Sequence, residues 1–190
     1  MTSPVAELVV QDDAIRRNAQ HFVALTGGRL LAVPKADAFG HGEIARSVLD
    51  AGASAIGVTS VAEALTLRAS GIDAPLLSWL NPVHADFAAA ITADVDLAVP
   101  SPDLMHAIGR AARRVGSTAR VHLHIDVGMA RDGCPTDEWA ILCALAREHL
   151  PRPGGHHRRR PGLTGPTQGH DRAADKEKAP TVTTRPGRDG

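Results

Sequence analysis

The sequence predicts an α/β fold, a parallel sheet that forms part of a (β/α)8 barrel. Three observations favour this class. Apolar runs of strand length recur along residues 1–150, and segments with helical spacing separate them. Most of these runs are apolar throughout rather than alternating, which is typical of parallel strands covered on both faces. No G-x-G-x-x-G turn follows the first run, although a doubly wound nucleotide-binding sheet usually carries one.

Five apolar runs are the predicted strands, about five of the eight that a complete barrel contains. They cover residues 29–34, 55–59, 75–80, 95–99 and 120–125. A further short strand candidate, ELVV at 7–10, lies outside this repeat.

Three helices are predicted from apolar spacing and capping residues. The first follows QDD, where Asp12 or Asp13 is expected to cap the helix. The second has Ser60 as its N-cap, Glu63 as the capping-box partner and Gly71 as its stop. The third carries an apolar stripe formed by Trp139, Leu142, Cys143, Ala146 and Leu150.

The composition changes abruptly near residue 150. Residues 1–150 carry 12 Lys or Arg and 17 Asp or Glu, whereas residues 151–190 carry 9 and 4. The second segment has 13 Gly or Pro among 40 residues and only two large aliphatic side chains. Because it cannot bury enough apolar surface to offset the entropy of ordering, we predict a disordered tail. A shifted reading frame in a GC-rich gene is one hypothesis for its origin.

The whole chain has 21 basic and 21 acidic residues. This balance gives no electrostatic reason to expect nucleic acid or an anionic membrane as a partner. The two cysteines are too few for a disulfide framework, and no leader or apolar run of membrane-spanning length is present. We therefore expect a cytoplasmic protein.

The run LLAVPK places Lys35 at the C-terminal end of the first predicted strand. Partial loss of hydration at such a position favours the neutral amine. A neutral amine is what Schiff-base chemistry with a carbonyl or with pyridoxal phosphate requires. In a (β/α) barrel, moreover, the chemistry lies at the C-terminal ends of the strands, so Lys35 is the main candidate for a functional residue.

Three segments carry a resemblance to one known family. AVPKADAFGHG, at 32–42, resembles the pyridoxal-phosphate attachment motif of alanine racemases, A-V-x-K-A-D-A-Y-G-H-G. HIDVGMARDG, at 124–133, is similar to the family's K-x-D-T-G-M-x-R-x-G segment on the fifth strand, and AELVVQDDAIRRN, at 6–18, resembles its opening strand and helix. The resemblance implies a pyridoxal-phosphate enzyme that interconverts L-alanine and D-alanine, which supplies D-alanine for cell-wall peptidoglycan.

The same resemblance implies roles for individual residues. Lys35 would attach the cofactor and then act as one of two bases at the α-carbon of the substrate. Arg131 would contact the phenolic oxygen of the cofactor and lie near the substrate carboxylate, as a permanently charged guanidinium can. Phe39 stands where the family has a tyrosine that hydrogen-bonds the cofactor phosphate. Trp79, at the end of the third predicted strand, is expected either to line the cofactor pocket or to pack in the core.

Several departures from the family pattern shape the functional prediction. His124 replaces a lysine that is carbamylated in many members, and Pro34 removes a backbone donor beside Lys35. The family's second base is a tyrosine from the other subunit of a homodimer, and this chain contains no tyrosine. We therefore predict the first two-fifths of an alanine racemase, with impaired activity and no metal. The alternatives are a pyridoxal-phosphate carrier that is not an enzyme, or an inert fragment.

Overall fold

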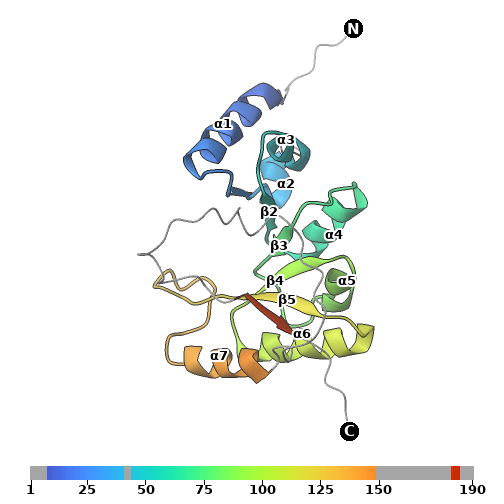
Figure 1. Ribbon diagram of the computed structural model, residues 1–190, viewed down its shortest axis with the longest axis vertical. Coiled ribbons are helices and arrows are strands. Elements are labelled where there is room, and N and C mark those ends of the chain that lie inside the picture. Colours follow the sequence, from blue (N-terminus) through green and yellow to red (C-terminus); the bar gives the residue numbers. More distant parts are fainter. Residues whose placement is uncertain (1–7, 41–43, 149–180, 185–190) are drawn as a thin grey trace, which may run out of the picture.

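The computed structural model describes residues 8–40, 44–148 and 181–184. Its strands form one sheet in sequence order, in which β1 to β5 are parallel and β6 is antiparallel to β5. The predicted α/β fold with five parallel strands is thereby confirmed (Figure 1). The strands are β1 (Leu31–Ala32), β2 (Ala55–Val58), β3 (Leu76–Ser78), β4 (Val95–Val99), β5 (Ala119–Leu123) and β6 (Thr181–Thr184).

Helices connect successive parallel strands, and in Figure 1 α4, α5 and α6 follow one another along one side of the sheet. Parallel neighbours need such crossover connections, because a tight turn can join only antiparallel strands. The helices are α1 (Asp12–Leu25), α2 (Lys35–Gly40), α3 (Ala45–Asp50), α4 (Val61–Ala69), α5 (Phe87–Thr92), α6 (Pro102–Val115) and α7 (Trp139–Glu148).

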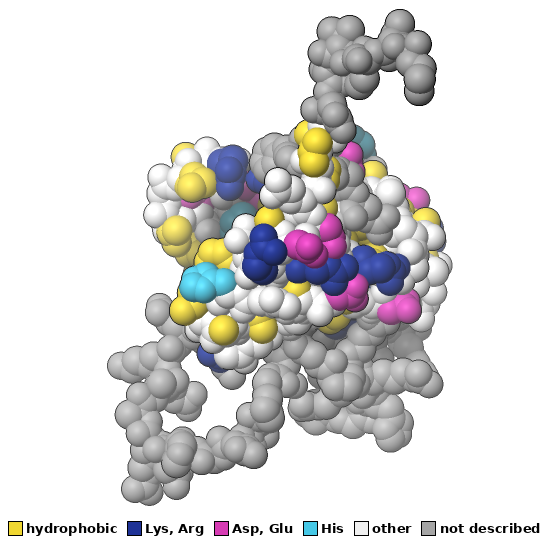
Figure 2. Space-filling view, turned by 90° about the horizontal axis from the view of Figure 1, so that it is seen from above, with side chains coloured by type: hydrophobic (Ala, Val, Ile, Leu, Met, Phe, Trp, Pro, Cys, Tyr) yellow, Lys and Arg dark blue, Asp and Glu magenta, His cyan; other side chains and the backbone are white. Residues whose placement is uncertain are grey.

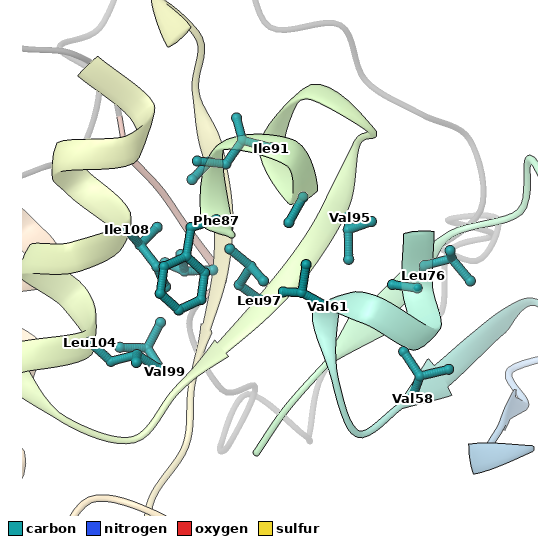
Figure 3. Close-up of a cluster of buried hydrophobic side chains, with 14 of the residues drawn as sticks. Val58, Val61, Leu76, Phe87, Ile91, Val95, Leu97, Val99, Leu104 and Ile108 are labelled. Carbon is teal, nitrogen blue, oxygen red and sulfur yellow. The ribbon is translucent and has the colours of Figure 1, made fainter. Parts of the chain in front are cut away.

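The apolar core lies between the sheet and these helices. Leu97 and Val99 of β4 are fully buried and lie beside Phe87 of α5 and Ile108 of α6 (Figure 3). The opposite face of the same strands carries polar side chains, among them the buried Asp96. The sheet therefore has one apolar face under helices and one face on which polar residues gather, as the wall of a barrel has.

The strand boundaries follow the prediction closely except at β1. Strand β4 has the predicted bounds, whereas β1 covers Leu31–Ala32 instead of 29–34. Pro34 lies beyond the end of β1, so its missing N–H removes no bond from the sheet. The strand predicted at 7–10 is wrong for residues 8–10, which have no regular structure, and Glu7 lies outside the described residues.

Of the predicted N-caps of α1 and α4, one is confirmed and one is wrong. The Ser60 hydroxyl accepts a hydrogen bond from the N–H of Glu63 at 3.2 Å, which confirms the predicted N-cap of α4. The predicted cap of α1 is wrong, because Gln11 occupies the N-cap position and makes no side-chain cap bond. Asp12 instead accepts hydrogen bonds from Arg16 and Ser47, and the latter ties α1 to α3.

Charged side chains of both signs are mixed on the face seen in Figure 2. Arg16 of α1 pairs with Asp12 at 2.6 Å and with Asp50 at 3.4 Å. None of the described helices is both long and apolar enough to span a bilayer.

The segment predicted as a disordered tail contains one described element. Thr181–Thr184 forms β6 and pairs with β5, from Ala119 opposite Thr184 to His122 opposite Thr181. The structure differs from the prediction at these four residues because TVTT is rich in β-branched side chains and β5 offers an open edge. Residues 149–180 and 185–190 lie outside the described residues, so disorder there stays a prediction.

Candidate functional site

The C-terminal ends of the parallel strands meet at one edge of the sheet. Lys35 follows β1, Thr59 follows β2, Trp79 follows β3 and His124 follows β5. In barrels of this type the chemistry lies at this edge. The predicted site residues Lys35, Trp79 and Arg131 therefore lie at or beyond the edge where a site is expected.

Lys35 begins the short element α2, a turn with unusual backbone geometry. Ala36, Asp37 and Ala38 have φ values of 54°, 50° and 50°, which are left-handed conformations that side chains other than glycine rarely adopt. Such a conformation costs about 1–2 kcal/mol for each residue. Within the turn, the N–H of Ala38 donates to the carbonyl of Pro34 at 3.2 Å. Backbone strain of this kind concentrates at functional sites, where the surroundings hold it in place.

The Glu63 carboxylate, from the first turn of α4, holds this strained segment. Oε1 accepts a hydrogen bond from the N–H of Ala36 at 2.9 Å, while Oε2 accepts from the N–H and the hydroxyl of Thr59 at 2.8 and 2.9 Å. Burial favours the neutral acid, but these hydrogen bonds outweigh it and lower the pKa of Glu63. Glu63 is therefore ionised at neutral pH and links the ends of β1 and β2.

A cavity of about 480 Å³ lies on the polar face of the sheet, beside β3, β4 and β5. Its volume falls within the range of roughly 300–1,000 Å³ that is typical of small-molecule sites. The cavity combines apolar walls with cationic and imidazole side chains. Its lining includes Leu77, Trp79, His122, His124, Asp126 and Arg131.

The loop that carries Arg131 is held by its own residues. Oδ1 of Asp126 accepts hydrogen bonds from the N–H of Gly128 at 2.9 Å and of Ala130 at 3.1 Å, and these bonds lower the pKa of Asp126. Gly133 has a φ of 116°, and a Cβ there would lie 2.5 Å from the backbone nitrogen of Asp126. The loop thus closes on a glycine that no other residue can replace without strain.

Trp79 reaches across β2, because Gly57 leaves room for it. A Cβ on Gly57 would lie 2.6 Å from Cζ3 of Trp79 and 2.7 Å from Cδ2 of Leu31. The indole therefore lies over the middle of β2 and also lines the cavity. Both expectations for Trp79, pocket lining and packing, describe parts of this arrangement, while contact with a cofactor stays a prediction.

A partly buried ion-pair network lies on the same face of β4 and β5. Asp96, whose side chain is 4% exposed, pairs with Arg120 at 2.5 Å and with His122 at 3.1 Å, and Arg120 also pairs with Asp94. Burial opposes the charge of Arg120, but its carboxylate partners outweigh burial and raise its pKa. Asp96 and Arg120 were not among the predicted site residues, although one acidic residue inside VDLAV and the alternation of polar and apolar residues in ARVHL indicated a polar inner face.

His124, at the position of the family's carbamylated lysine, faces Asp132. Its Nδ1 lies 3.3 Å from Oδ2 of Asp132, and neither atom has a hydrogen-bond partner among the described residues. Among all the residues that the structure describes, no group of three His, Cys, Asp or Glu side chains is arranged to hold a metal ion.

The structure brings some of the predicted site residues together. Trp79 and Arg131 line one cavity, whereas Lys35 is absent from its lining and lies two strands away from Trp79. Among the residues that the structure describes, neither Lys35 nor Arg131 forms an ion pair. The Phe39 side chain lies outside the described residues.

These residues suit pyridoxal phosphate in their chemistry. The half-buried Lys35 is a primary amine at the expected edge of the sheet, and Arg131 is a cation on a cavity of suitable size. An amine to attach the aldehyde and a guanidinium to hold an oxyanion are groups that this cofactor needs.

Comparison with known proteins identifies the family. The family model described as alanine racemase, N-terminal domain, matches residues 10–154. An alanine racemase from Beutenbergia cavernae is 46% identical over 149 residues, which are 77% of this chain and 39% of that protein. The chain belongs to the alanine racemase family and matches the model of its N-terminal domain over residues 10–154.

Solved structures agree with this assignment. The alanine racemase from Streptomyces lavendulae superposes with a TM-score of 0.69 and 36% identity, over 72% of this chain and 38% of that one. A histidine racemase from Leuconostoc mesenteroides gives a TM-score of 0.63 and 30% identity, over 73% of this chain and 37% of that one. The chain thus spans about two-fifths of the length of the relatives that it matches.

Proposed function

We propose that this chain binds pyridoxal phosphate through Lys35 and contributes that lysine to the racemisation of alanine. The observation that carries the proposal is the position of Lys35, at the C-terminal end of β1 and without an ion-pair partner among the described residues. Membership of the alanine racemase family supports the choice of cofactor and reaction.

When bound, pyridoxal phosphate withdraws electrons from the α-carbon of an attached amino acid and so makes its proton acidic. Lys35 then serves as a base on one face of the α-carbon, where its amine accepts the proton. Arg131 binds an oxyanion of the cofactor or the substrate carboxylate, because its guanidinium stays charged at any working pH.

Racemisation also needs a proton donor on the opposite face of the α-carbon. The chain contains no tyrosine, so the second group of the family pattern is not among these 190 residues. We propose that the other subunit of a homodimer supplies this group. The group would lie in a region that corresponds to the part of the relatives that this chain does not match. Without it, we expect impaired racemisation.

Alanine is the proposed substrate, since the relatives of highest identity named above are alanine racemases. One of the similar solved structures is a histidine racemase. A cytoplasmic location fits the two cysteines, Cys134 and Cys143, which are both free.

The missing tyrosine favours a second candidate function. A chain that anchors pyridoxal phosphate but lacks a second proton donor would be a carrier of the cofactor and not an enzyme. Such a carrier shows the absorbance of the bound cofactor and forms no D-alanine.

The test is a titration of the purified chain with pyridoxal phosphate, followed by visible absorbance and then by an assay for D-alanine. We expect a cofactor band that Lys35→Ala abolishes. Lys35 is the only lysine in residues 1–150, and the other two are Lys176 and Lys178. A Lys176→Arg, Lys178→Arg double variant is therefore the matched control and should keep the band. An unchanged band in Lys35→Ala would overturn the proposal, while a band without D-alanine would favour the carrier.

A further inference from the structure

Glu63 connects the turn after Lys35 to the neighbouring strand. One carboxylate oxygen accepts from the N–H of Ala36, the residue next to Lys35, and the other accepts two hydrogen bonds from Thr59. All three distances lie between 2.8 and 2.9 Å. An ionised carboxylate accepts at both oxygens at once, which a side-chain amide cannot do.

The turn and α4 both line a small pocket. This pocket has a volume of about 170 Å³ and is lined by Pro34 and Asp37 of the turn region and by Val58 and Glu63 on the other side. Asp37 itself is exposed. Among the described residues of this segment Ala38 is buried, and the hydrogen bond from Ala36 to Glu63 adds a directional restraint on a segment whose backbone is strained.

We propose that Glu63 is a positioning residue for Lys35. Its carboxylate holds the N–H of Ala36 and so keeps the left-handed turn in the form that presents the lysine amine at the edge of the sheet. The effect on cofactor binding rests on the proposed function of Lys35, whereas the restraint on the turn does not.

Three substitutions separate this role from general stabilisation of α4. Glu63→Ala removes both acceptors, and Glu63→Gln keeps one acceptor oxygen in a side chain of the same length. Ser60→Ala is the matched control, because it removes the cap bond to the N–H of Glu63 and weakens the start of α4 while the carboxylate stays in place.

The first measurement is amide hydrogen exchange of the peptide spanning residues 34–40, made without cofactor. Loss of a hydrogen bond to a charged acceptor should accelerate exchange by about tenfold in Glu63→Ala. Glu63→Gln should be intermediate and Ser60→Ala should match the wild type. Wild-type exchange in Glu63→Ala, or equal acceleration in Ser60→Ala, would overturn the proposal. If Glu63→Ala does not unfold cooperatively, Glu63→Gln decides by the same criterion.

The second measurement is borohydride trapping of pyridoxal phosphate on the full chain, with labelling of Lys176 and Lys178 as an internal reference. We expect the ratio of Lys35 label to reference label to fall by about tenfold in Glu63→Ala and to stay unchanged in Ser60→Ala. An unchanged ratio in Glu63→Ala would contradict the positioning role. If the wild type takes no label at Lys35, the proposed function fails, and hydrogen exchange still decides whether Glu63 holds the turn.

Discussion

The turn after β1 and the loop after β5 lie at the same edge of the sheet, and both contain residues with positive φ. In the first, Ala36, Asp37 and Ala38 are left-handed and are tied down by Glu63 from α4. In the second, Asp126 and Gly133 close the loop within itself. The lysine thus depends on a side chain 28 positions away in the sequence, and the arginine depends on its immediate neighbours.

This difference has a consequence for the effects of mutation. In a loop that is held by its own residues, we expect substitution to have the largest effect where two backbone segments of the loop approach each other most closely. A clash there displaces the loop itself, because no neighbouring element can shift instead. A turn held from outside is most sensitive at the residue that holds it.

Gly133→Ala should have the largest effect. Its φ of 116° strains any side chain, and the added Cβ would meet the backbone of Asp126 at 2.5 Å. We expect a loss of about 3 kcal/mol or more in the free energy of unfolding, measured with denaturant. Gly128 has nearly the same φ, 114°, with nothing within 4 Å of its Cβ position, so Gly128→Ala should cost only about 1–2 kcal/mol. Equal losses of unfolding free energy in the two variants would show that the close approach of Gly133 to the backbone of Asp126 is unimportant.

Gly57→Ala tests the region between the two loops. The new Cβ would overlap the Trp79 ring and Leu31, and overpacking of this kind costs about 1–3 kcal/mol. We expect the indole to move, which changes the tryptophan fluorescence of the folded chain. Trp79→Phe in the same background removes the moving fluorophore, while Trp139 remains as a reference. Fluorescence identical to the wild type would contradict the placement of Trp79 over Gly57.

Acid should loosen the lysine turn before it unfolds the chain. The pKa of Glu63 is lowered in the folded state, so its contribution is present above the ordinary carboxyl pKa of about 4.3 and is lost as the pH falls through the lower folded value. Hydrogen exchange in residues 34–40, corrected for intrinsic rates, should rise in that range. Glu63→Gln should lack this rise, and a rise of equal size in the variant would assign it to another group.

Asp126→Asn should have the smallest effect. The amide oxygen still accepts hydrogen bonds from Gly128 and Ala130, so the loop after β5 keeps its shape. The midpoint of denaturation should change little, whereas Asp126→Ala, which has no acceptor, should lower it clearly. A large effect of the asparagine variant would mean that the charge, and not the acceptor, holds the loop.

Much of the fold was predictable because its signals are local. Continuous apolar runs gave the five parallel strands, and the Ser60 and Glu63 pattern gave the start of α4. Helix α6 carries equally clear signals, with Ser101 as N-cap, Pro102 in the first turn and Gly116 at φ 63° after the end. The sequence analysis did not use these signals, although they were available.

The candidate site was predictable only in part. Motifs predicted Lys35 and Arg131, and their roles stay predictions, whereas the contacts of Glu63 with Ala36 and of Asp96 with Arg120 join residues 24 or more positions apart. Such contacts depend on strand order and register, which periodicity does not specify. The left-handed turn was hidden as well, since Ala36, Asp37 and Ala38 are not residues that usually mark positive φ.

The proposal that Lys35 attaches pyridoxal phosphate is tested most directly by locating the cofactor on the chain. The wild type is incubated with pyridoxal phosphate, reduced with borohydride, digested and mapped by mass spectrometry. We expect the label on Lys35 when less than one equivalent of pyridoxal phosphate is added per chain. Label confined to Lys176, Lys178 or the N-terminus, or no label at all, would contradict it.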